Sequence, residues 1–148
     1  PNHFHLLVEQ ISDNGISLFM QKLGTGYTMY FNLMNERAGS LFQGTFKAKL
    51  IDDETYLTHL LRYIHLNPVE LIESGWKING VKNWQRIIKF LDSYKWSSHN
   101  DYSGKKVYPG IVHKDFLLEL LGGPKEYRNF LKDWLVKDLS TIENLLLD

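Results

Sequence analysis

The sequence contains no cysteine, which excludes a disulfide scaffold and any metal site built on thiolates. It also has no run of the roughly 18 to 20 apolar residues that a membrane-spanning helix needs. Neither sign of charge is in excess, because 17 basic residues balance 17 acidic ones. A strongly basic chain would point directly to nucleic acid, so any such function must here be argued from a site.

What is present is an ordinary composition for a folded protein. The chain has 148 residues, of which 43% are hydrophobic and 23% charged, and this is enough to build a hydrophobic core. The lack of cysteine fits a reducing cytoplasm. The aromatic residues (8 Phe, 8 Tyr and 4 Trp) can supply a core, stacking surfaces for nucleic-acid bases, or both.

Two segments have the alternation that is typical of a β-strand. In residues 3–9, Phe4, Leu6 and Val8 share one face, which leaves His3 and His5 on the other. In residues 41–51 the polar side chains alternate with apolar ones. The polar face there consists of Gln43, Thr45, Lys47 and Lys49.

The remaining pattern is helical. Apolar residues recur at the helical period from Ile16 to about Asn35 and again over residues 53–66, where Pro68 ends the helix. Further amphipathic helices are expected over residues 84–91, 114–121 and 124–137, and Gly122-Gly123 separates the last two.

His3 and His5 form a His-x-His pair whose Cα atoms lie about 6.5 to 7 Å apart on a strand. Two imidazoles at this distance can converge on one divalent ion, although most histidine pairs on strands bind nothing. On the helix, Tyr63 and Asn67 are one turn apart on one face. They suit a nucleophile beside a third metal ligand, and equally a half-buried aromatic beside a plain helix C-cap.

Several motifs, in order, resemble the REP-associated tyrosine transposases, which are single-tyrosine transposases of the HUH endonuclease superfamily. These motifs are PNHFHLLVE, GSLFQGTFKAKLIDDETYL and LLRYIHLNPVE, followed by KWSSHNDYSG at residues 95–104. The strong part of the resemblance covers roughly residues 1 to 70.

The resemblance implies a chemistry and a location. His3, His5 and Asn67 would hold Mg²⁺ or Mn²⁺, and Tyr63 would attack a phosphodiester of single-stranded or hairpin DNA to give a 5′-phosphotyrosine. Reversal of that step would join strands in DNA transposition. It also implies a bacterial cytoplasmic protein with no membrane partner, and related enzymes can form homodimers that share active sites.

The resemblance also implies a fold. The family has an α+β, ferredoxin-like antiparallel sheet with helices on one face, and here the first β-α-β would be missing ahead of Pro1. We therefore expect a partial catalytic core over residues 1–73 and a C-terminal helical extension over residues 74–148, packed on the same domain. Such an N-terminally truncated chain would be less stable than a complete one, and could be inactive even with all its metal ligands present.

Other residues are weaker candidates. Lys47 and Lys49 could meet DNA phosphates or form an ordinary solvent face. On the tyrosine helix, Arg62 could contact a phosphate, and His59 could orient Tyr63, contact DNA or simply face solvent. Tyr56 is the rival tyrosine, two turns before Tyr63. Trp96 is expected to be a packing residue rather than a platform on which bases stack.

Two other functions fit the same residues. One is a relic that binds a DNA hairpin without cutting it. The other is a His-x-His metal hydrolase that uses activated water and in which Tyr63 is only structural.

Overall fold

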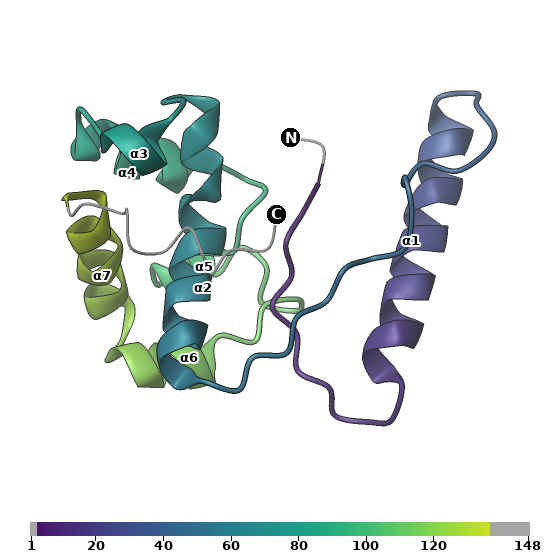
Figure 1. The fold of residues 1–148 in the computed structure, drawn as a ribbon, viewed down its shortest axis with the longest axis horizontal. Helices are drawn as coiled ribbons and strands as arrows, with labels where there is room; N and C mark the ends of the chain where they lie inside the picture. Colours follow the sequence, from purple (N-terminus) through teal and green to yellow (C-terminus); the bar gives the residue numbers. More distant parts are fainter. Residues whose placement is uncertain (1–2, 137–148) are drawn as a thin grey trace. The chain divides into compact units, whose positions relative to one another are not determined.

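The computed structural model describes residues 3–136 and forms two compact units, Pro1–Leu50 and Ile51–Asp148, which are taken one at a time (Figure 1). All the regular structure in the described residues is helical. The boundary predicted between residues 73 and 74 falls inside the second unit.

The first unit contains one long helix, α1 (Gly15–Met34), as the apolar periodicity predicts. The helix ends at Asn35, whose backbone N–H donates to the carbonyl of Phe31 at 3.1 Å. The loop that follows is closed by the side chain of Asn32, which donates to the carbonyl of Gly39 at 2.9 Å.

The two predicted strands do not form, and the prediction of an α+β ferredoxin-like sheet is wrong. Residues 3–11 and 46–53 have no regular secondary structure, and residues 41–45 form bends. Alternation of side chains is only half of what defines a strand, because the backbone must also pair with a neighbouring backbone in register. Within residues 3–136 no such ladder is present, so the alternating segments remain irregular.

Aromatic contacts hold the first unit together. The ring of Phe42 lies 6.3 Å from that of Tyr27 on α1 and 6.2 Å from that of Phe4. Phe42 reaches the helix at Gly24, where an added Cβ would lie 4.0 Å from the ring. None of residues 3–50 is buried, however, so this unit has no interior of its own. The apolar stripe predicted for α1 is present, but none of its side chains is buried.

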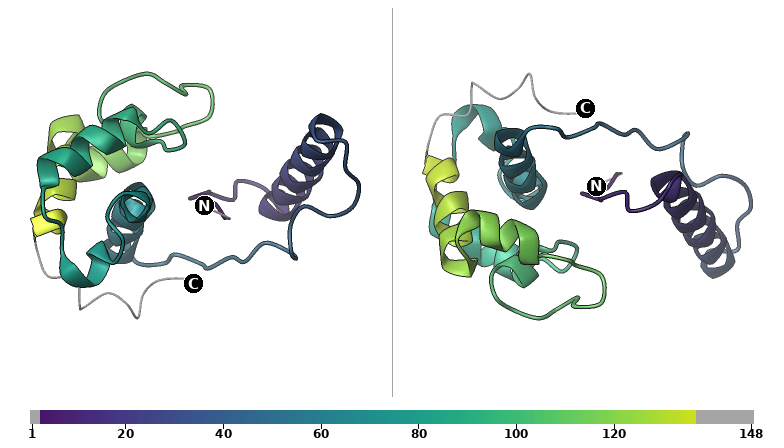
Figure 2. Two further views of the ribbon diagram at one scale, coloured as in Figure 1. Left: turned by 90° about the horizontal axis from the view of Figure 1, so that it is seen from above. Right: turned by 90° about the horizontal axis from the view of Figure 1, so that it is seen from below.

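The second unit is a cluster of helices. After α2 (Glu54–Leu66) and the 3-10 helix η1 (Asn67–Leu71) come the helices α3 (Trp76–Asn79), α4 (Trp84–Ser93), α5 (His99–Tyr102), α6 (Asp115–Leu121) and α7 (Pro124–Val136). Figures 1 and 2 show how they gather: α7 packs against α2, α4 and α6, and η1 packs between α2 and α4.

Four of these helices lie where the sequence predicts them, and their ends have clear causes. Asp53 caps α2 by accepting from the N–H of Tyr56 at 2.6 Å, and Asn83 caps α4 by accepting from Arg86 at 3.0 Å. Gly122 ends α6 with a φ of 86°, a left-handed conformation that favours glycine. The short helices η1, α3 and α5 are too brief to show a periodicity.

The core of the second unit is formed where these helices meet. Its apolar side chains come from η1 and from α2 through α7, and the completely buried ones are Leu66, Val69, Ile87, Leu91 and Leu131. Because residues 3–50 bury nothing completely, this core supplies most of the hydrophobic stabilisation in the described chain.

Within residues 3–136, no helix combines the length and the apolar character needed to cross a bilayer.

Substitution of two isoleucines tests the position of this core. Ile87→Ala removes a side chain that is 0% exposed and should lower the free energy of unfolding by about 2–5 kcal/mol. Ile78→Ala removes the same atoms from a side chain that is 75% exposed and should change it by no more than about 0.5 kcal/mol. Urea denaturation followed by tryptophan fluorescence measures both. Equal losses for the two variants would contradict this core.

Candidate functional site

Tyr63 and Asn67 lie one turn apart where α2 ends. The backbone N–H of Asn67 donates to the carbonyl of Tyr63, and Pro68 follows in the first turn of η1. Both side chains are half-buried. Proline cannot donate the next helical hydrogen bond, so the helix changes to the tighter 3-10 form here. The local sequence therefore presents the two side chains together at a helix end.

A third residue joins this pair from α3. The ammonium group of Lys77 lies 4.5 Å from the centroid of the Tyr63 ring, in the geometry of a cation–π contact. Lys77 belongs to a connector to which the sequence assigns no role. It places a positive charge beside the candidate nucleophile, where a DNA phosphate would also be attracted.

The rival Tyr56 is on the first turn of α2. Seven residues separate it from Tyr63, which is about 10 Å along a helix axis. Tyr56 is therefore distant from Asn67 and Lys77, and Tyr63 has the better surroundings for a reacting group.

His3 and His5 lie side by side in the first unit. Their ring centroids are 5.0 Å apart, with the rings nearly perpendicular. The irregular backbone of residues 3–11 thus brings the two imidazoles together without a sheet. Within residues 3–136 no group of three or more His, Cys, Asp or Glu side chains is placed to hold a metal ion. Asn67 is not one of these residue types, so this finding does not bear on a site that includes it.

The four predicted DNA-contact residues have different surroundings. Lys47 and Lys49 are exposed on an irregular segment, so they do not share a strand face. The His59 ring is half-buried, 5.4 Å from that of Trp134, and burial together with the charge of Arg62 lowers its pKa. This histidine is therefore uncharged at neutral pH.

Arg62 is enclosed by aromatic rings. Its guanidinium lies 3.6 Å from the centroid of the Phe130 ring and 3.9 Å from that of Trp134 on α7. The residue is 8% exposed, and burial lowers its pKa to about 10, so it keeps its charge at neutral pH. Its stacking joins α2 to α7, and a contact with phosphate stays a prediction.

A chain of hydrogen bonds that the sequence does not predict lies in the interior of the second unit. Tyr127 Oη lies 3.0 Å from Nδ1 of His65 and 2.8 Å from Nδ1 of His99. At one end His65 Nε2 is 2.7 Å from Ser98 Oγ, and at the other His99 Nε2 is 3.3 Å from Asp92. His65, His99 and Tyr127 are completely buried.

Only one arrangement of protons satisfies every member of this chain. Arg128 donates to the Asp92 carboxylate at 2.5 Å; although burial opposes ionisation of Asp92, this partner holds its pKa below the usual value. His99 must then donate from Nε2 to Asp92 and accept at Nδ1 from the Tyr127 hydroxyl. Tyr127 in turn accepts from Nδ1 of His65, which leaves His65 Nε2 to accept from Ser98.

Burial keeps this chain neutral. It lowers the pKa of His65 to about 3, with a smaller contribution from His99, and it also lowers the pKa of His99 against the opposing effect of Asp92. Burial likewise raises the pKa of Tyr127 well above its ordinary value. The helical register could have revealed that His65 is buried, because His65 follows the buried Leu61 by one turn on α2.

The network joins two of the family-like motifs. Ser98 belongs to KWSSHNDYSG and His65 to LLRYIHLNPVE, so their 2.7 Å contact brings these distant segments together. His65 is two residues after Tyr63, and the network therefore fixes the end of α2 on which Tyr63 and Asn67 lie.

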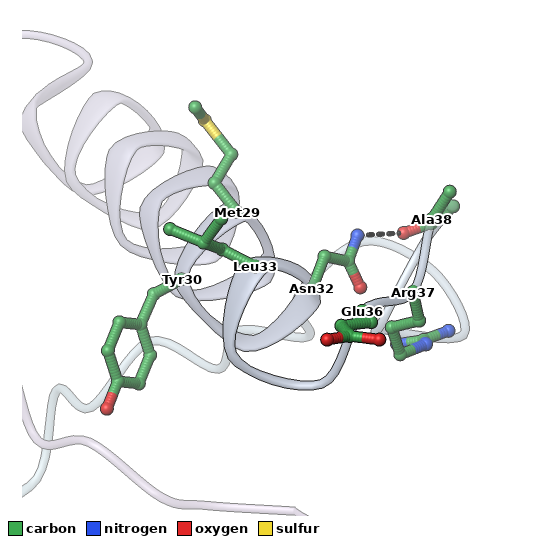
Figure 3. Close-up of a pocket in the computed structure, with 8 residues that line it drawn as sticks. Met29, Tyr30, Asn32, Leu33, Glu36, Arg37 and Ala38 are labelled. Carbon is green, nitrogen blue, oxygen red and sulfur yellow. Dashed lines mark hydrogen bonds between the residues drawn. The ribbon is translucent and has the colours of Figure 1, made fainter.

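A shallow hollow lies at the C-terminal end of α1 (Figure 3). Figure 3 shows the side chain of Asn32 closing one side by its hydrogen bond to the loop backbone. The lining is mostly apolar and includes Met29, Tyr30 and Leu33, with Glu36 and Arg37 at one edge. It contains none of the predicted site residues.

Comparison of the chain with family models, with curated proteins and with solved structures finds no match.

Removal of one hydroxyl tests the buried network. Tyr127→Phe leaves Nδ1 of both histidines without its partner, so we expect the free energy of unfolding to fall by about 2–4 kcal/mol. Tyr102→Phe is the matched control, because Tyr102 is also buried but its hydroxyl is not part of the chain of hydrogen bonds. Urea denaturation measures both variants, and an equal effect of the two would show that the network does not matter.

The neutral histidines also predict a dependence on pH. The pKa of each is lower in the folded than in the unfolded state, so their stabilisation is complete above about pH 6.5 and is lost as the pH falls below it. For His65, whose pKa in the folded state is about 3, the loss should be about 1.4 kcal/mol per pH unit between these two values. His99 contributes in the same direction.

Urea denaturation at pH 7.0, 6.0 and 5.0 measures this slope. His65→Gln should reduce the slope by about one histidine's share. A slope that is the same in His65→Gln and the unsubstituted protein would contradict a neutral, buried His65.

Proposed function

We propose that this protein is a metal-dependent endonuclease and strand transferase for single-stranded DNA, of the REP-associated tyrosine transposase type, with Tyr63 as the nucleophile. The observation that carries the proposal is the meeting of Tyr63, Asn67 and Lys77 at the end of α2. A tyrosine beside an amide ligand and a cation is a suitable group to attack a phosphate. The ordered motifs of the sequence support the same function.

The metal in this proposal is Mg²⁺ or Mn²⁺, held by His3, His5 and Asn67. The paired imidazoles fit this assignment, since their centroids are only 5.0 Å apart, and a set of two nitrogens and one amide oxygen suits Mn²⁺ better than Mg²⁺, which prefers oxygen ligands throughout. A bound divalent ion would polarise the scissile phosphodiester and stabilise its developing charge.

The protein's own residues carry the covalent step. Tyr63 Oη forms a bond to phosphorus as the bond to the 3′-oxygen breaks, which gives a 5′-phosphotyrosine and a 3′-hydroxyl. The phenolic proton is released, and the leaving oxygen takes up a proton. The energy of the broken ester is kept in the new one, so attack by another 3′-hydroxyl joins strands without an external energy source. Lys77 would hold the phosphate beside the phenol.

A second candidate function is DNA binding without cleavage. It is favoured by the irregular backbone of residues 3–11, which carries His3 and His5 with no strand ladder to fix it. Metal ligands on such a segment are less well preorganised than on a sheet. A homodimer and a bacterial cytoplasmic location stay predictions.

A covalent adduct tests the first function directly. The chain is incubated with a single-stranded DNA hairpin carrying a 3′ and a 5′ flank, in Mn²⁺, and the products are separated on a denaturing gel. We expect a protein–DNA adduct that Tyr63→Phe reduces at least about 10³-fold and that Tyr56→Phe retains. Both variants should keep the urea midpoint of the unsubstituted protein.

The other outcomes identify the alternatives. Binding with no adduct would contradict the nuclease and support the DNA-binding function. Cleavage that survives Tyr63→Phe would contradict the tyrosine mechanism and favour a hydrolase that uses activated water.

A further inference from the structure

Trp96 belongs to the second unit but lies outside its core. Its side chain is 85% exposed, although tryptophan is the largest apolar side chain and is usually largely buried. The prediction that it is a packing residue is therefore wrong within the described structure. It lies between α4 and α5, in the segment KWSSHNDYSG.

The backbone beside this exposed ring is fixed. The carbonyl of Lys95 accepts from the hydroxyl of Tyr108 at 2.7 Å, and Ser98 meets the buried His65 at 2.7 Å. Ser97 Oγ also accepts from the backbone N–H of His99 at 3.2 Å. Because the backbone on both sides of Trp96 is held, only the side-chain torsions of the indole remain to be ordered when it binds a flat partner.

The segment around Trp96 is strongly basic, although the whole chain is neutral. Residues 76–114 contain eight lysines and arginines and only two acidic residues, Asp92 and Asp101. Neither carboxylate is paired with Lys95 or Lys106. Asp101 is 1% exposed and accepts from the backbone N–H groups of Val107 and Tyr108, and Asp92 is paired with Arg128 and, at 3.8 Å, with Lys105.

Two exposed lysines belong to the same fixed surface. Lys95 directly precedes Trp96 in the chain. Lys106 is in the loop that Asp101 anchors, and Tyr108 joins that loop to the carbonyl of Lys95. Lys105 is engaged differently, since its ammonium donates to Asn100 at 2.9 Å.

We propose that Trp96, Lys95 and Lys106 form a binding surface for single-stranded DNA, in which the indole stacks on a base and the two ammonium groups contact phosphates. An exposed aromatic ring among lysines is complementary to unpaired bases on a polyanion. A duplex does not offer a free base face, so this surface selects single strands. The proposal rests on the proposed function for its choice of DNA.

Binding measured without chemistry keeps the two proposals apart. The full chain carries Tyr63→Phe and is kept in EDTA, and fluorescence anisotropy follows a labelled single-stranded oligonucleotide. Trp96→Ala should weaken binding roughly 5- to 150-fold, the cost of one lost base stack, with an unchanged salt dependence. Phe116→Ala, an equally drastic change at another exposed aromatic, should bind like the parent.

Further variants separate stacking from other contacts. Trp96→Phe keeps an aromatic face and should retain most of the affinity, whereas Trp96→Leu should lose it. On an oligonucleotide of abasic sites, Trp96→Ala should bind like the parent. Lys95→Gln and Lys106→Gln should each reduce the slope of log affinity against log salt by about 0.7, the share of one phosphate contact on a single strand.

Three results would overturn the proposal. They are an unchanged affinity in Trp96→Ala, equal binding by Trp96→Leu and the parent, and a large fall of the urea midpoint in Trp96→Ala. The last result would show that Trp96 packs against another part of this chain. A Trp96-dependent affinity with no covalent adduct would keep this inference and contradict only the proposed cleavage.

Discussion

The hydroxyl of Tyr127 lies between two buried imidazoles, and the organisation of the second unit depends on it. A hydroxyl can donate and accept at once, so it can complete both His65 and His99 while both stay uncharged. This hydroxyl lies on α7 and links a histidine of α2 to a histidine of α5. The contact of His99 with Asp92 brings α4 into the same network. In an interior where an unpaired polar group costs more than a hydrogen bond gains, this arrangement specifies how the helices pack.

The candidate site is a consequence of that packing. His65 and Tyr63 are on the same helix but face different surroundings: His65 is completely buried in the network, whereas Tyr63 is half-buried beside Lys77. Stacking of Arg62 between Phe130 and Trp134 adds a second attachment of α2 to α7. The last turn of α2 is thus held at Arg62 and at His65, and Tyr63 is presented by a rigid element.

The sequence predicts the helices well and the sheet wrongly, for one physical reason. A helix closes its own hydrogen bonds, so the periodicity of residues such as Leu57, Leu61 and Ile64 is enough to place α2. A strand needs a partner elsewhere in the chain, and the alternation around Phe4 or Phe46 contains no information about whether that partner exists. Burial is a tertiary property as well, which is why Trp96 was expected in a core and is exposed.

The sequence predicts two pairs of neighbouring candidate residues. Spacing alone brings Tyr63 next to Asn67 on a helix and His3 next to His5 on an extended segment, and the structure contains both pairs. Lys77 and the buried histidine network depend on contacts between distant segments, so no local pattern could reveal them. The two pairs belong to different units, and the proposed function requires one metal ion to join them.

Paramagnetic broadening by Mn²⁺ tests that requirement most directly. In an isotope-labelled protein, stoichiometric Mn²⁺ should broaden the side-chain amide signal of Asn67 together with the imidazole signals of His3 and His5. The broadening at Asn67 should vanish when both histidines are replaced by alanine. Broadening confined to His3 and His5, with a sharp Asn67 signal, would contradict the shared metal site and the tyrosine chemistry proposed for it.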